Sequence, residues 1–366
     1  MIFLKRKGKI LNILKTSVSF ILCFTALLCI LQRVPQCFSQ NPAVLAAATF
    51  TLNNGTYKII DNTKNENQDE DTLVIEKNQN KTGQSANTDK TYEKRDKSNY
   101  YDSFAEHKGE NKYTISENSY FGTGTQIENF YIKNKTDANY DFEKYLNSPL
   151  TFNIDKNTES PQILIYHTHT TEGYMDEDVD YFYESFYSRT ENSDFNVVAV
   201  GNRITEILNS KGISTYHDTT IHDATYEGAY ERSGNSVKKD MEKYKDIKVV
   251  LDIHRDAIGT DENKIKPVFT YNGKKAAQIM ILSGCDDGSN WFPNWENNLN
   301  FALKIQNKAE ELYPGMTRPL SFGYFRYNEY VCDGSLLIEV GTEANSVDEV
   351  EYTGELLANV LAEVLS

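Results

Sequence analysis

The spacing of apolar residues in the second half of the chain predicts alternating strands and helices. Short apolar runs typical of buried strands recur, and apolar residues between them fall at helical spacing. The expected strands are residues 163–166, 213–217, 248–253, 277–283 and 336–338, and the expected helices are 197–208, 301–312 and 346–364. Lys211-Gly212 and Pro314-Gly315 end two of these helices, and Ser346 with Glu349 forms a capping box for the last. This alternation predicts an α/β fold with a mixed, largely parallel sheet flanked by helices.

The N-terminus shows a different pattern, with basic residues before a long apolar run. Lys5, Arg6 and Lys7 precede the apolar residues 17–31, and the first 60 residues contain no Asp or Glu. With residues 10–14 included, the run reaches the roughly 20 residues that span a bilayer. We expect residues 1–36 to be a cytoplasmic tail and retained transmembrane signal anchor, with the rest of the chain outside the cell membrane. Peptidase cleavage after Ser39, or after residues 46–48, is the open alternative.

The segment between this anchor and the α/β region is polar and rich in Asn, Lys, Asp, Glu, Ser and Thr. Between residues 62 and 98 its one apolar cluster is Leu73-Val-Ile75. Such a segment buries too little apolar surface to offset its chain entropy. We therefore expect residues 37–139 to be a low-complexity, disordered linker and residues 140–366 to be one catalytic domain.

Charge and cysteine content exclude some partners and some types of domain. The 366 residues carry a net charge of −15, which argues against nucleic acid as a partner because phosphate backbones attract Lys and Arg. Of five cysteines, only Cys285 and Cys332 lie beyond the N-terminal region. An exported domain with so few cysteines is not a disulfide scaffold, and a single Cys285–Cys332 bridge is the alternative.

Three of the expected strands end in polar side chains with catalytic potential. The segments are Ile163-Leu-Ile-Tyr-His-Thr-His-Thr-Thr-Glu172, Val249-Val-Leu-Asp-Ile-His-Arg-Asp256 and Leu336-Leu-Ile-Glu-Val-Gly341. Sites in open α/β sheets form beyond the carboxyl ends of the strands, so these clusters converge if the strands are neighbours. His167 and His169 face the same side if that stretch is extended. Imidazole and carboxylate ligands suit Zn²⁺ with a position left open for water.

These segments resemble the stage II sporulation protein P family, which is related to zinc-dependent N-acetylmuramoyl-L-alanine amidases. The resemblance lies in ILIYHTHTTEGY, LDIHRD and LLIEVGTEANS, and it covers about residues 140–366. It implies a zinc amidase-like fold in which His169 and His254 are zinc ligands and Glu339 is the catalytic carboxylate. A third, acidic ligand is implied just before the helix that starts near Asn196.

The spacing does not fix that third ligand. Asp194 fits the implied place best, and Glu191 and Glu172 are the alternatives. Glu172 also follows the histidine motif closely enough to orient a ligand or substrate. Arg255 and Asp256 either orient a ligand or grip a substrate carboxylate, or form a structural salt bridge.

The resemblance implies cleavage of peptidoglycan between muramic acid and L-Ala, and of peptide cross-links, during sporulation engulfment. Its implied partners are the lytic transglycosylase stage II sporulation protein D and the membrane protein stage II sporulation protein M. A zinc peptidase of other specificity and an inactive wall-binding scaffold are the alternative functions. The scaffold is disfavoured because a binding module does not need Glu339 beside His169 and His254.

Overall fold

A computed structural model describes residues 107, 109–289 and 291–366 of the chain. The expected anchor and most of the expected linker lie outside these residues. Within the described part, no helix is both long and apolar enough to span a bilayer. Cys285 and Cys332 are both free thiols, so the bridge between them is not formed.

The main sheet has eight strands in the order β2-β3-β12-β11-β13-β7-β4-β6. All neighbouring pairs are parallel except β2–β3 and β11–β13, which confirms the mixed, largely parallel sheet. In chain order the strands are β2 Thr125–Ile127, β3 Phe130–Asn134, β4 Ile163–Tyr166, β6 Thr215–His217, β7 Val249–Asp256, β11 Ile279–Gly284, β12 Leu320–Gly323 and β13 Gly334–Thr342.

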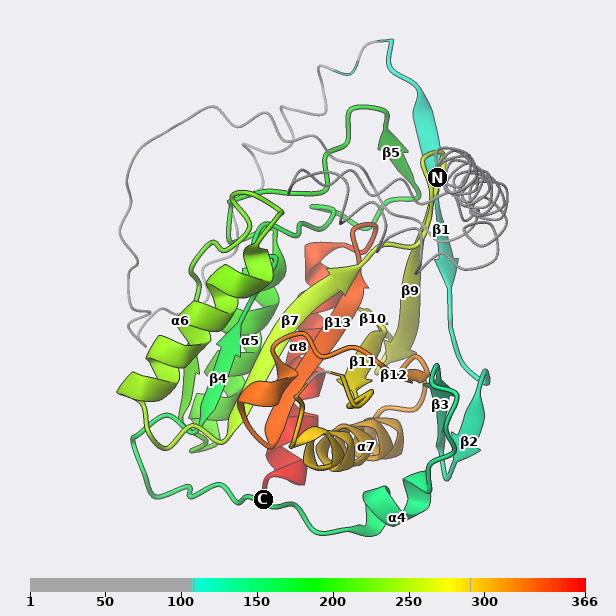
Figure 1. Cartoon of the computed structure of the whole chain (residues 1–366). Coiled ribbons are helices and arrows are strands. Elements are labelled where there is room, and N and C mark those ends of the chain that lie inside the picture. Colours follow the sequence, from blue (N-terminus) through cyan, green and yellow to red (C-terminus); the bar gives the residue numbers. More distant parts are fainter. Residues whose placement is uncertain (1–106, 108, 290) are drawn as a thin grey trace, which may run out of the picture. The chain divides into compact units, whose positions relative to one another are not determined.

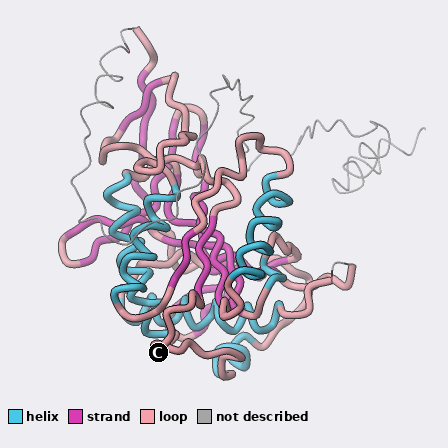
Figure 2. Tube along the Cα trace, turned by 90° about the vertical axis from the view of Figure 1, so that its left-hand side faces the viewer, coloured by secondary structure: helices cyan, strands magenta, loops and turns pink. Residues whose placement is uncertain are grey.

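Helices cover both faces of this sheet. They are α4 Phe142–Asn147, α5 Val197–Ser210, α6 Ala229–Lys243, α7 Trp295–Leu312 and α8 Val347–Val364, with the short 3-10 helix η1 at Glu329–Val331. Helix α6 lies in front of the sheet and α5 and α8 lie behind it (Figure 1). The strands run between two helical layers in the side view (Figure 2). The predicted capping box of Ser346 and Glu349 is present at the start of α8.

Side-chain alternation along the central strands divides the interior in two. Val249, Leu251 and Ile253 of β7 belong to the larger core, together with apolar residues of α5, α7 and α8. Val250 belongs to a smaller core with Val237 of α6. Because successive side chains point to opposite faces of a strand, Asp252 and His254 lie on the α6 face. That face carries the candidate site.

A second, five-stranded sheet has the order β10-β9-β1-β5, with β8 paired to β9. Its strands are β1 Lys112–Asn118, β5 Tyr181–Tyr183, β8 Gly259–Thr260, β9 Asn263–Tyr271 and β10 Lys274–Ala277. Strands β1, β2 and β3 all precede residue 140, so the folded part begins well before the boundary we expected. The reason is tertiary: β1 pairs with β9, and β3 pairs with β12, and neither partner is apparent from the local composition.

Candidate active site

Strands β4, β7 and β13 are parallel neighbours, so their carboxyl ends meet at one edge of the sheet. Glu339 of β13 is directly opposite His254 of β7 in the register. The sheet thus brings two of the expected site residues together on the α6 face. The third, His169, lies in the turn that follows β4.

His169 is buried beside His254. The two rings have centroids 5.5 Å apart and are nearly perpendicular. Nδ1 of His169 is shielded from solvent and has no hydrogen-bond partner, and the nearest carboxylate, Asp223, is 3.9 Å away. Burial lowers the pKa of His169, partly offset by the charge of Glu172, so its ring is neutral at pH 7. A neutral imidazole with a free nitrogen is the form that binds a metal.

Glu172 lies beside His254 at the same sheet edge. Its Oε2 is 3.4 Å from Nδ1 of His254 and accepts a hydrogen bond from the backbone N–H of Arg255 at 3.2 Å. Burial alone raises the pKa of Glu172, but hydrogen bonding and the charges of His254, His169 and Arg255 hold it below its usual range. Glu172 is therefore an ionised, buried carboxylate beside His254, and close enough to His169 for the two charges to interact.

The other two acids proposed as third ligand lie elsewhere. Asp194 and Glu191 are both exposed in the turn before α5. The backbone N–H of Asp194 bonds to Asn192 within that turn. Of the three alternatives, Glu172 is the one that the structure brings to the histidines.

Glu339 is partly exposed, but its Oε2 is shielded from solvent and has no hydrogen-bond partner. Burial and the charge of Asp256 raise the pKa of Glu339 to about 8, against the opposing effect of His254. A carboxyl group with a raised pKa and a free oxygen suits a residue that accepts and returns a proton near neutral pH.

Sequence reasoning missed Asp252, which lies behind His254. Its Oδ1 is 2.9 Å from Nε2 of His254, an ion-pair contact with angles outside hydrogen-bond geometry. Asp252 also accepts hydrogen bonds from the backbone and hydroxyl of Thr168, at 2.8 and 2.6 Å. Burial lowers the pKa of His254, but Asp252 and Glu172 outweigh it and raise that pKa well above the usual value. Carboxylates in this position commonly orient metal-binding histidines.

Asp223 is a second missed residue and fixes the turn that holds His169. Its fully buried carboxylate accepts hydrogen bonds from the hydroxyl of Thr171 at 2.7 Å and from Arg189 at 2.9 Å. Asp223 comes from the loop after β6, which no local sequence pattern links to His169.

Arg255 and Asp256 both form structural contacts. The Arg255 guanidinium donates to the carbonyl and hydroxyl oxygens of Ser188 at 3.0 Å, and Asp256 pairs with Arg318 at 2.7 Å. Asp256 therefore forms a structural salt bridge, one of the expected alternatives. Arg255 instead hydrogen-bonds the segment around Ser188.

The expectation that His167 and His169 face the same side is wrong. Strand β4 ends at Tyr166, so the two histidines lie in a turn and diverge. His167 contacts His217 at 2.8 Å and the carbonyl of Ile253 at 2.8 Å, on the α5 side of the sheet. It is a buried structural residue there.

The side chains at this sheet edge include donors that could hold a metal ion. Over the described part of the chain, no three His, Cys, Asp or Glu side chains already have the arrangement of a formed metal site. Even so, His169, His254 and Glu172 offer nitrogen and carboxylate donors of the kind that zinc prefers. The 3.4 Å between the His254 and Glu172 donors matches the roughly 3.3 Å that tetrahedral bonds of about 2.05 Å imply. The donor set thus fits zinc chemically.

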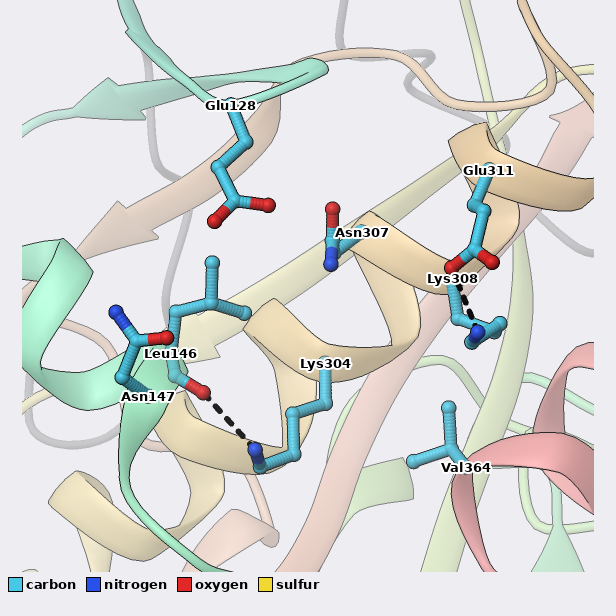
Figure 3. Close-up of a pocket in the computed structure, with 8 residues that line it drawn as sticks. All are labelled: Glu128, Leu146, Asn147, Lys304, Asn307, Lys308, Glu311 and Val364. Atoms are coloured by element: carbon cyan, nitrogen blue, oxygen red, sulfur yellow. Dashed lines mark hydrogen bonds and ion pairs between the residues drawn. The ribbon is translucent and has the colours of Figure 1, made fainter.

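A separate hollow of about 330 Å³ lies among α4, α7, α8 and the β2–β3 turn. Lys304 and Lys308 line it together with Glu128 and Glu311 (Figure 3). Lys304 already donates to the carbonyl of Leu146, and Lys308 pairs with Glu311. None of the candidate site residues lines this hollow.

Comparison with known proteins gives a family match. The sequence profile of the stage II sporulation protein P family matches residues 43–362. Stage II sporulation protein P of Bacillus subtilis (strain 168) is 28% identical over 223 residues, which is 55% of this chain and 50% of that protein. The chain spans about half the length of the curated relative it matches.

Solved structures with a similar arrangement are amidases at low sequence identity. The CwlD amidase from Clostridioides difficile, solved in complex with the GerS lipoprotein, is 11% identical, with a TM-score of 0.36 over 56% of this chain and 98% of that one. N-acetylmuramoyl-L-alanine amidase AmiC2 of Nostoc punctiforme is 11% identical, with a TM-score of 0.31 over 56% of this chain and 94% of that one.

Proposed function

Because the chain belongs to the stage II sporulation protein P family, we propose that it is a cell-wall hydrolase of sporulation. It cleaves the amide between the muramoyl sugar of peptidoglycan and L-Ala, and it also cuts peptide cross-links. One observation carries the proposal. His169, His254 and Glu172 lie at one sheet edge together with Glu339, whose Oε2 has no hydrogen-bond partner.

In this proposal His169, His254 and Glu172 hold zinc, and Glu339 is the proton carrier. Zinc, when bound, supplies a Lewis acid for the amide carbonyl. Glu339 takes a proton from the attacking water and returns it to the leaving nitrogen. Asp252 faces Nε2 of His254, and Asp223 fixes the turn that carries His169, so the donors stay preorganised.

The cellular setting is also part of the proposal and rests on the family. Residues 1–36 anchor the chain in the cell membrane, with the hydrolase on the outer side at the engulfing septum. Stage II sporulation proteins D and M are the expected partners, the former as the transglycosylase that cuts the glycan strands.

The test is to digest purified peptidoglycan with the full chain, identify the products by mass, and measure zinc content on the same samples. His169→Ala and His254→Ala should lose both zinc and product, because the remaining donors hold zinc poorly. His107→Ala, which removes a histidine that stacks on Tyr183 away from the site, is the matched control. Cleavage of cross-links without release of stem peptides from glycan supports the peptidase alternative. Wall binding without any product supports the scaffold.

A further inference from the structure

Beside the candidate ligands is a tyrosine that neither the family resemblance nor the proposed reaction explains. The ring of Tyr226 lies parallel to that of His169, with centroids 4.7 Å apart and an interplanar angle of 2°. Tyr226 is 58% exposed, against 45% for Tyr187 and 44% for Tyr324. An exposed aromatic ring next to a candidate metal ligand has the features of a ligand-binding surface.

The backbone that carries Tyr226 is fixed even though its side chain is exposed. Arg232 of α6 donates to three carbonyls of this loop: that of His222 at 2.5 Å, that of Glu227 at 2.9 Å, and that of Thr225. Arg189 also lies near the ring, 5.4 Å from its centroid. The Tyr226 ring is thus presented by a preorganised loop, which lowers the entropic cost of binding.

Further tyrosines continue this aromatic surface along the α6 side. Tyr230 packs edge-on against His169 at 5.6 Å, and Tyr327 stacks on Tyr230 at 5.3 Å. Tyr327 has a φ of +42°, a left-handed conformation that a bulky residue rarely adopts. Backbone strain of this kind persists where the surroundings enforce it, often at ligand-binding sites. Here the Tyr327 ring is held in its stacked position on Tyr230.

The chemistry of the substrate indicates which of its groups binds to these tyrosines. We propose that Tyr226, with Tyr230 and Tyr327 beside it, is a subsite for a pyranose ring of the glycan strand; this rests on the proposed amidase reaction. Two groups flank the amide that is cut, the muramoyl sugar and L-Ala. The methyl group of L-Ala covers little of an aromatic ring. A pyranose presents a flat face of C–H groups that matches the Tyr226 ring in size, and its hydroxyls remain in water.

The proposal is tested with a probe that contains no peptide, the β-1,4-linked tetramer of N-acetylglucosamine, titrated into the full chain and followed by calorimetry or NMR. Tyr226→Ala should weaken binding on the order of tenfold. Tyr226→Phe keeps the ring and should bind within about twofold of wild type. Phe121→Ala removes another exposed ring, 49% exposed, that packs on Tyr131 of β3, far along the sheet, and it should change nothing.

A kinetic measurement separates this subsite from a structural role. With zinc content verified as unchanged, Tyr226→Ala should raise KM for glycan-attached stem peptides and leave kcat nearly as it was. Undetectable tetramer binding by the wild type, equal binding by Tyr226→Ala, or equal losses in Tyr226→Ala and Tyr226→Phe would overturn the sugar subsite. If the wild-type chain releases no stem peptide, the proposed hydrolysis fails instead, and the tetramer titration alone decides the subsite.

Discussion

Replacing Asp252 with Asn should weaken zinc binding without unfolding the protein. Asp252 is 2% exposed and uses both oxygens, accepting two hydrogen bonds from Thr168 and facing Nε2 of His254 at 2.9 Å. Asparagine has one acceptor oxygen, so its amide N–H₂ must face either a Thr168 donor or His254. The substitution also removes the negative charge that holds the ring of His254.

The expected size of the effect follows from these contacts. Losing a buried hydrogen bond to a charged group costs about 1.5–3 kcal/mol of folding stability. Residues that orient a metal ligand from behind typically change metal affinity by about 10–100-fold. We therefore expect the zinc dissociation constant of Asp252→Asn to rise on the order of 10–100-fold, together with a modest loss of stability.

The assay is a competition titration of zinc between the full chain and a chromophoric chelator. Glu310→Gln is the matched control, because Glu310 is also a buried carboxylate and accepts three hydrogen bonds, from Gly315 and Thr317, away from the histidines. It should lose stability and keep its zinc affinity. If Asp252→Asn binds zinc like wild type, or no more weakly than Glu310→Gln, then Asp252 does not position His254.

Three further predictions follow from the site and its surroundings. Gly201→Ala should lower the free energy of unfolding in urea by about 1–3 kcal/mol, because the new Cβ would lie 2.5 Å from Nε2 of His217. Gly354→Ala on α8 is the control, because its new Cβ would have no atom nearer than 3.3 Å and should cost less. Equal stabilities of the two variants would contradict the packing around Gly201. Because Asp252 and Glu172 raise the pKa of His254 well above its usual value, zinc must displace a proton from this ring at neutral pH. Zinc affinity should therefore rise with pH by up to about tenfold per unit below that pKa, and calorimetry in buffers of different ionisation enthalpy that finds no proton release would contradict this. A reporter fused after Ser366 should be active only if it functions outside the cytoplasm, and activity of a cytoplasmic reporter instead would exclude a role at the cell wall.

Local patterns were sufficient for the elements that carry their own apolar signal. Strand β4 and the capping box of α8 occur where the sequence predicts them. Helix α6 was missed because it buries only Ala229, Ser233 and Val237, and its N-cap Gly228 makes no side-chain hydrogen bond. A helix with so few apolar residues owes its position to the sheet it covers.

The candidate site also contains residues that local sequence patterns place and residues that only tertiary contacts place. The meeting of His254 and Glu339 was predictable because both lie near the carboxyl ends of parallel strands, and Asp252 could have been found from the period of two along β7. Glu172 could not be chosen over Asp194, because its place depends on a turn fixed by distant residues. The hydroxyl of Thr170 donates to the carbonyl of Thr220, and Thr171 bonds to Asp223. These contacts join segments about 50 residues apart.

The central claim is that zinc ligands and a separate proton carrier meet at the edge of β4, β7 and β13. The most direct test is Glu339→Gln in the full chain, with zinc content, peptidoglycan binding and stem-peptide release measured on one preparation. The substitution keeps the size of the side chain and removes its basic oxygen. We predict that zinc and wall binding are retained while the rate falls by a factor on the order of 10²–10⁴. Loss of zinc would make Glu339 a ligand, and full activity would show that the proton carrier is another residue.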